Sequence, residues 1–123
     1  MYQNDTKTVV SNVTPFPRPI NWSNLRTDEA ERIIRQRAQI TGAVIFTDHT
    51  WDRVSERDIP REDVTEILLK GHCHEQPFRN EKGNWQVLIS KRLSGSREAG
   101  AVTVILEEAE NLVIRTVEWV DPK

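Results

Sequence analysis

The chain has 123 residues, 37% of them hydrophobic and 29% charged, and its 17 Lys and Arg residues against 19 Asp and Glu residues give a formal net charge of −2. This length predicts one domain with its own core, and the single cysteine, Cys73, excludes an internal disulfide and favours a reducing compartment. The near-neutral charge argues against nucleic-acid binding by bulk charge, and without a long apolar run or a signal-peptide pattern we expect a cytoplasmic protein with no membrane partner.

Residues 1–26 are predicted to be an extended N-terminal leader. Three prolines between positions 15 and 19 each fix φ and remove a backbone donor, which disfavours regular structure there. Trp22 and Leu25 mark the point where the leader is expected to dock, since a large aromatic side chain gains much by burial. The remaining residues, 27–123, are predicted to form a single α+β domain.

The first predicted helix begins at Thr27 as a candidate N-cap and contains apolar residues at helical spacing. Gly42 stops this helix. A short apolar run at 43–46 follows, and its pattern fits either a strand or an extended entry into the next helix.

Two more short helices are predicted on either side of Pro60. Thr47 is the expected cap of the first, which covers 48–58. The second runs over about 61–70 and ends at Gly71, which is expected in the C′ position.

After these helices the pattern turns to strands. Alternating or β-branched apolar residues predict strands over 85–90, 101–106 and 112–120. Short connections favour antiparallel neighbours. The expected architecture is therefore two or three N-terminal helices packed on a three- to four-stranded antiparallel sheet.

The helix over 48–58 carries the densest cluster of side chains that could act in chemistry. At spacings of one to four residues it contains His49, Arg53, Glu56 and Arg57. A histidine transfers protons near neutral pH, an arginine stabilises charge that develops on a phosphoryl group, and a carboxylate orients either one. These residue types suit RNA cleavage without a metal. The alternative is a solvated helix face on which Glu56 pairs with Arg53.

Charge is also segregated along the chain. Five bases and one acid lie between positions 79 and 97, which gives this segment a local charge of +4, whereas the C-terminal residues are acidic. Phosphate contacts supply affinity for RNA and an aromatic ring can stack a base. The predicted RNA-binding residues are Arg79, Trp85, Lys91 and Arg92. The alternative places Trp85 in the core and leaves the loop as a soluble surface.

The third feature is the run His72, Cys73 and His74. On a strand the two histidines would share a face and Cys73 would point away. Two histidines do not complete a structural zinc site, so no metal is expected, and a catalytic role for either histidine stays open. The chain has no Gly-rich phosphate loop, GxSxG, paired CxxC or HExxH motif, and we expect no cofactor.

The segment VIFTDHTWDRVSERDIPREDVTEILLKGH resembles the bacterial domain-of-unknown-function family 4258. The matching residues are Phe46, Asp48, His49, Arg53, Glu56, Arg57, Ile59, Asp63, Val64 and Gly71. Asp58 and Pro60 depart from the pattern, which has glycine and a capping Ser or Thr there. Asp58 can still adopt a turn conformation. The resemblance covers about residues 27–121, and its layout looks like the small toxins of the RelE/ParE and BrnT type. Such toxins act on RNA without metal or poison a target by binding it, and an antitoxin neutralises them.

The resemblance implies a toxin-like, metal-independent endoribonuclease, a hydrolase of RNA, or a degenerate relative of one. In this hypothesis His49 is the general acid or base, Arg53 and Arg57 contact phosphate, and Glu56 holds their geometry. RNA is the expected substrate and an antitoxin protein the expected partner, and a homodimer is open. The alternative is a non-catalytic protein-binding or regulatory module.

Overall fold

The computed structural model describes residues 19–93 and 95–120, so most of the predicted leader lies outside the described residues. The elements in chain order are α1 (Thr27–Ala38), β1 (Val44–Phe46), α2 (Asp48–Arg57), α3 (Arg61–Lys70), β2 (His72–Cys73), β3 (Phe78–Arg79), β4 (Trp85–Arg92), β5 (Glu98–Ile105) and β6 (Leu112–Trp119). No helix within the described residues is long and apolar enough to cross a membrane.

The strands form one open sheet in the order β1-β6-β5-β4-β2, with β3 also paired to β4. The α+β class is therefore confirmed, and β4, β5 and β6 are antiparallel neighbours. The sheet has six strands instead of three or four, and it is mixed because β1 runs parallel to β6. The additional strands have two or three residues each, too few for an alternating pattern to identify them.

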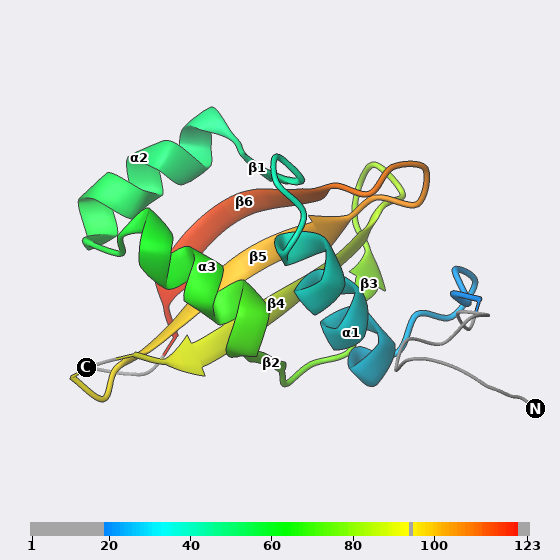
Figure 1. Cartoon of the computed structure of the whole chain (residues 1–123), viewed down its shortest axis with the longest axis horizontal. Helices are drawn as coiled ribbons and strands as arrows, with labels where there is room; N and C mark the ends of the chain where they lie inside the picture. The colour runs from blue at the N-terminus through cyan, green and yellow to red at the C-terminus, as the bar shows by residue number, and fades with distance from the viewer. Residues whose placement is uncertain (1–18, 94, 121–123) are drawn as a thin grey trace, which may run out of the picture.

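The helices α1 and α3 lie in front of the sheet in Figure 1, and α2 packs along β6 near the β1 edge. Alternation along β4 turns Trp85, Val87 and Ile89 into the core, as the sequence predicts. The larger buried side chains between helices and sheet are Ile33, Ile34, Val64, Ile67, Leu68, Val87, Ile89, Leu112, Ile114 and Val117.

The opposite face of β4, β5 and β6 is not covered by α1 or α3, and we call it the uncovered face. Alternation and strand register assign to it Gln86, Leu88, Ser90 and Arg92 of β4, and Glu98, Gly100, Val102 and Val104 of β5. Of these residues Arg92 is exposed, three are buried and the remaining four are half-buried, so the face is accessible in part.

The helix caps follow the sequence in one case and differ in another. Thr47 caps α2, because its hydroxyl accepts a hydrogen bond from the Thr50 N–H at 3.1 Å. Thr50 is fully buried, and its own hydroxyl donates to the Ile114 carbonyl of β6. The predicted cap at Thr27 is wrong: Arg26 is the N-cap residue of α1 and makes no side-chain capping bond, so Thr27 already lies inside the helix.

The residue after α2 and the residue at the end of α3 have different backbone conformations. Asp58 adopts the left-handed conformation with φ 56, which confirms that it can replace the glycine usual at this position. Gly71, with φ −79, is the C-cap residue of α3 and not the C′ residue that the sequence predicts. It is needed for space, because a Cβ there would lie 2.5 Å from the Ile67 carbonyl oxygen and 2.7 Å from that of Ser90.

Candidate functional site

The four predicted catalytic residues all lie on or at the end of α2, at the edge of the sheet. His49 is exposed, and among the described residues it has no hydrogen-bond or ion-pair partner. Arg53 Nη1 donates to Glu56 Oε1 three positions along the helix. This local pair is the one expected for a solvated helix face, and it leaves His49 without a carboxylate beside it.

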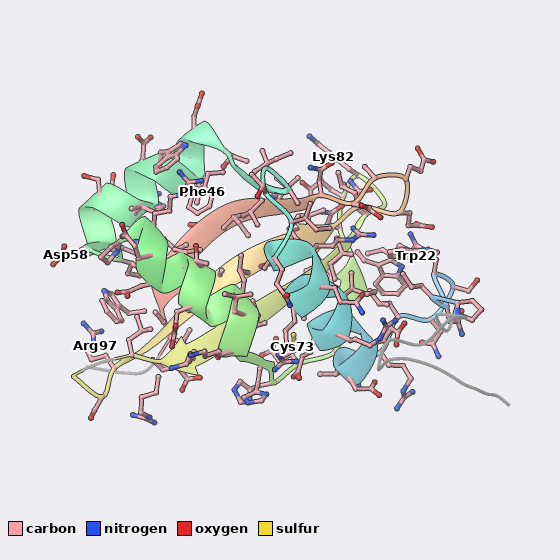
Figure 2. All side chains as sticks on the ribbon, in the orientation of Figure 1. Trp22, Phe46, Asp58, Cys73, Lys82 and Arg97 are labelled. Atoms are coloured by element: carbon pink, nitrogen blue, oxygen red, sulfur yellow. The ribbon has the colours of Figure 1, made fainter. Side chains whose placement is uncertain are left out.

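Several other residues of the segment that resembles the family have packing roles. Ile59 and Val64 are fully buried in the core. The Phe46 ring, labelled in Figure 2, lies 4.9 Å from the Trp51 ring, and the Arg61 guanidinium lies 5.5 Å from the first and 5.7 Å from the second. Packing therefore accounts for several residues of this segment, whereas the His49 side chain remains exposed.

Trp119 at the end of β6 joins α2 to the β4–β5 hairpin. Its indole N–H donates to the Arg57 carbonyl at 2.9 Å, and the Arg97 guanidinium stacks over its ring at 4.2 Å. Asp58 and Arg97 are accordingly labelled at the same end of the molecule in Figure 2. The tertiary structure thus brings Arg57 to the basic hairpin, a contact that spacing alone does not predict.

Trp85 and Arg79, two of the predicted RNA-binding residues, make structural contacts within the protein. Trp85 is 7% exposed, and its indole N–H donates to the Trp22 carbonyl at 2.8 Å. The Arg79 guanidinium covers the Trp85 ring at 4.5 Å and donates to the Trp22 and Gly83 carbonyls and to Glu107. A base has no access to the buried ring in this arrangement, which matches the alternative that places Trp85 in the core.

Lys91 and Arg92 lie on opposite faces of the sheet, because side chains alternate along β4. Lys91 Nζ lies 3.4 Å from Glu66 on α3. Arg92 lies on the uncovered face, directly opposite Glu98 of β5, and donates to the Ser96 carbonyl at 2.6 Å. The local charge of +4 in the sequence is therefore divided between two faces and does not form one basic patch.

A hollow of about 270 Å³ opens on the uncovered face at the His74 end of the sheet. We call it the His74 hollow, and its lining consists of His74, Glu75, Leu88, Ser90, Glu98 and Val120. Gly100 lies between two of the walls, since a Cβ on it would lie 2.7 Å from Leu88 and 2.8 Å from Val120. Glycine at this position therefore leaves room for both apolar side chains beside the polar ones.

The polar groups of the His74 hollow form a connected set. Ser90, 2% exposed, donates from its hydroxyl to Glu98 Oε2 at 2.6 Å, and His74 Nε2 lies 3.5 Å from the same oxygen. Among the described residues Glu98 Oε1 has no hydrogen-bond partner. A carboxylate with one fixed and one available oxygen, beside an imidazole, can take up and release protons on a bound substrate.

Sequence reasoning noted His74 but missed Glu98 and Ser90. No sequence pattern links the three residues, because they are separated along the chain and only strand pairing brings them together. The expected shared face of His72 and His74 is not used as a pair: β2 ends at Cys73, and the two imidazoles approach carboxylates on different elements.

His72 and Cys73 belong to a separate cluster around Glu31 of α1. Glu31 accepts from the Cys73 N–H at 2.7 Å, and its carboxylate lies 3.5 Å from His72 Nδ1 and 3.3 Å from Arg35. Burial would raise the pKa of Glu31, but these hydrogen bonds outweigh it and lower the pKa. Burial, reinforced by the Glu31 charge, raises the pKa of the Cys73 thiol to about 12. These contacts fix β2 against α1.

A second hollow of about 230 Å³ lies at the other end of the uncovered face, and we call it the Arg115 hollow. Arg115 Nη1 donates to Gln86 Oε1 at 2.9 Å and lies 3.2 Å from Glu81 Oε2. The pKa of Glu81 is lowered, first by a hydrogen bond from its own backbone N–H and then by Arg115. Val104 and Val113 supply an apolar floor.

No group of three or more His, Cys, Asp and Glu side chains that could hold a metal ion occurs within residues 19–93 and 95–120.

Comparison with known proteins identifies the family. The sequence model described as Domain of unknown function (DUF4258) matches residues 46–119, more than half of the chain, and the chain belongs to this family. No curated protein and no solved structure gives a significant match. The matched segment includes α2, α3 and every strand from β2 to β6. It contains all the residues that line the Arg115 hollow and all those that line the His74 hollow except Val120.

Proposed function

We propose that this member of the DUF4258 family is a toxin-like, metal-independent endoribonuclease whose RNA-binding surface is the uncovered face of the sheet. The observation that carries the proposal is the His74–Glu98 pair, with Nε2 and Oε2 3.5 Å apart, in a hollow open to a ligand. Helices followed by the antiparallel strands β4, β5 and β6 also support a likeness to RelE/ParE and BrnT toxin folds.

In the proposed reaction Glu98 is the general base and His74 the general acid. Glu98 Oε1 takes the proton of a ribose 2′-hydroxyl, and the 2′-oxygen attacks the adjacent phosphorus. The bond between phosphorus and the 5′-oxygen breaks, and the imidazolium of His74 donates its proton to that oxygen. The products are a 2′,3′-cyclic phosphate and a 5′-hydroxyl end. Transfer of a proton from Glu98 to His74 then restores both groups.

Ser90 and Arg92 support this chemistry. The buried Ser90 hydroxyl holds Glu98 Oε2 at 2.6 Å, so that Oε1 faces the substrate in a fixed direction. Arg92 lies across from Glu98 on the same face and can contact the phosphate next to the cleaved bond. The predicted residues His49, Arg53, Glu56 and Arg57 form a competing site on α2.

The charges around the two hollows predict weak dependence on salt. Three carboxylates there stand against three bases and the His74 imidazolium of the proposed reaction: the carboxylates are Glu75, Glu81 and Glu98, and the bases are Lys82, Arg92 and Arg115. Neutralising at most four phosphates gives a slope of log K against log salt no steeper than about −3 for single strands. Affinity for RNA therefore depends on fitted contacts more than on bulk charge.

The test is cleavage of single-stranded RNA by the purified full chain in the presence of a chelator. We expect His74→Ala and Glu98→Gln to lose about 100-fold or more in rate, the usual effect of removing a general acid or base. His72→Ala is the matched control, because both histidines have side chains 66% exposed and lie 3.5 Å from a glutamate. That control should stay within about twofold of the wild type, with thermal unfolding unchanged in all three variants.

The same assay locates the site. A selective loss in His49→Ala and Arg53→Ala, with His74→Ala fully active, would move catalysis to α2 and refute the role of the His74 hollow. If the wild-type protein leaves every RNA intact, the endoribonuclease proposal fails.

A second candidate function, a non-catalytic protein-binding module, is favoured by apolar exposure near the β1 edge. Ile45 is 43% exposed on β1 and Trp51 is 45% exposed on α2. A protein partner, such as an antitoxin or a second copy of the chain, could cover these side chains. An Ile45→Ser and Trp51→Ser double variant should then lose the complex in analytical ultracentrifugation while keeping its fold, and an unchanged complex would exclude this surface.

A further inference from the structure

The Arg115 hollow lies on the same uncovered face as the His74 hollow and has no part in the reaction proposed above. We infer that the Arg115 hollow is a base-binding subsite selective for guanine in single-stranded RNA. The inference rests on the proposed function, because it names the substrate preference of that same face. Three observations support the inference: the apolar floor of the hollow, the acceptor Glu81 beside the donor Arg115, and the distance between the hollow and Glu98.

The floor of the hollow can accept the flat face of a base. Val104 of β5 and Val113 of β6 are cross-strand neighbours, and Leu106 extends the same surface beyond β5. Val104 is 4% exposed and closes the floor from below, so the apolar surface open to a base is that of the half-buried Leu106 and Val113. A base that lies on this surface turns its polar edge toward the β3–β4 connection.

The rim presents an acceptor beside a donor, which matches one edge of guanine. Glu81 and Arg115 lie side by side, with Glu81 Oε2 and Arg115 Nη1 3.2 Å apart. An ionised carboxylate only accepts hydrogen bonds, and a guanidinium only donates them. The Watson–Crick edge of guanine has two adjacent donors, N1–H and the 2-amino group, next to the acceptor O6. Adenine, cytosine and uracil lack two adjacent donors, so they cannot satisfy both carboxylate oxygens.

Arg115 retains donors for a ligand. Its bonds to Gln86 and Glu81 use Nη1 alone, and among the described residues Nη2 and Nε have no hydrogen-bond partner. The hydrogen bonds that lower the pKa of Glu81 favour the ionised carboxylate, which is the accepting form. The Asn84 side-chain amide lines the same hollow and also has no hydrogen-bond partner within residues 19–93 and 95–120.

The two hollows are separated by a distance that suits neighbouring nucleotides. Gln86 lies beside Arg115 and Ser90 beside Glu98, and both belong to β4. Four residues along a strand span about 13 Å. A guanine in the Arg115 hollow therefore places a phosphodiester group one or two nucleotides along the chain at the His74–Glu98 pair.

The inference is tested by titrating the full chain with guanosine 3′-monophosphate and adenosine 3′-monophosphate in a calorimeter. We expect the guanine nucleotide to bind at least about tenfold more tightly, the order of discrimination that hydrogen bonds to a charged group supply. Glu81→Gln should abolish this preference, because a carboxamide cannot accept both donors. Glu108→Gln is the matched control, since Glu108 is exposed and outside the Arg115 hollow, and it should keep the preference.

Equal binding of the two nucleotides, no binding of either, or a preference that survives Glu81→Gln would overturn the inference. Cleavage measured on the same preparations separates this result from the proposed function. Cleavage without a guanine preference refutes only the subsite, whereas a Glu81-dependent preference in a protein that cleaves no RNA refutes only the endoribonuclease.

Discussion

Arg37 of α1 offers the sharpest test of how the helices are fixed to the sheet. The residue is 8% exposed, and its Nη1 donates to the Leu106 carbonyl at 2.7 Å and to the Asn111 carbonyl at 3.1 Å. These two carbonyls lie at the start and the end of the β5–β6 connection. One guanidinium therefore holds both ends of that loop against α1, and Arg37→Met removes the donor while keeping most of the aliphatic stem.

The expected cost follows from the two lost bonds. A hydrogen bond from a charged group contributes about 1.5–3 kcal/mol, and a buried group left without a partner costs about 1–3 kcal/mol. Two effects reduce the sum: the exposed loop between the two carbonyls admits water, and a buried charge no longer has to be desolvated. We expect Arg37→Met to lower the free energy of unfolding by about 2–3 kcal/mol.

The assay is urea unfolding of both Arg37→Met and the matched variant Arg32→Met. Arg32 is on the same helix, but its side chain is 33% exposed and pairs with Glu29 within the helix. Removing such a pair should cost about 0.5 kcal/mol or less. If Arg37→Met is no less stable than Arg32→Met, the buried Arg37 side chain and its two hydrogen bonds to carbonyls do not stabilise the contact between α1 and the β5–β6 connection.

Three further outcomes are expected. Gly71→Ala should lower the free energy of unfolding in urea by about 2 kcal/mol or more, because the two closest atoms to the added Cβ are the backbone carbonyl oxygens of Ile67 and Ser90, which cannot move aside as a flexible side chain can; an unchanged value would contradict the close approach. The Cys73 thiol, with its pKa raised to about 12, should react with iodoacetamide at pH 8 far more slowly in the native protein than in urea, and equal rates would show that it is not buried. The pKa of Glu31 is lowered in the folded state, so the unfolded state binds more protons as the pH falls below about 4.5. Stability should therefore decline through that range, and the decline should be smaller in Glu31→Gln; equal pH profiles of unfolding would refute the effect.

The sequence predicted the regular elements well where the pattern was long or had a specific cap. The helix over 61–70 and the three long strands are found close to their predicted positions, and Thr47 caps α2 as expected. Periodicity and capping are local properties, and a local pattern that agrees with the fold is sufficient to identify an element. Strands of two or three residues have no such pattern, and the parallel β1–β6 pair depends on chain segments far apart in the sequence.

The candidate site could be predicted only in part. Residue types identified the α2 cluster, the basic segment and the histidines at 72 and 74, because each is a run of neighbouring residues. Burial removed Trp85 from the accessible surface, and strand alternation separated Lys91 from Arg92. The His74–Glu98 pair was missed because 23 residues of chain, which include β3 and β4, lie between its members.

Composition, periodicity and the segment that resembles the family by themselves determined the α+β class, the membership of a family, the lack of an internal disulfide and a small net charge. These are properties of residues counted or compared along the chain. Only the tertiary structure decided which acids lie beside which bases, because strand pairing and register, and not distance in sequence, bring Glu98 to His74 and Glu81 to Arg115. The same pairing leaves one face of the sheet uncovered by α1 and α3, and it places both acidic and basic side chains around the two hollows on that face, which the total charge of −2 does not reveal.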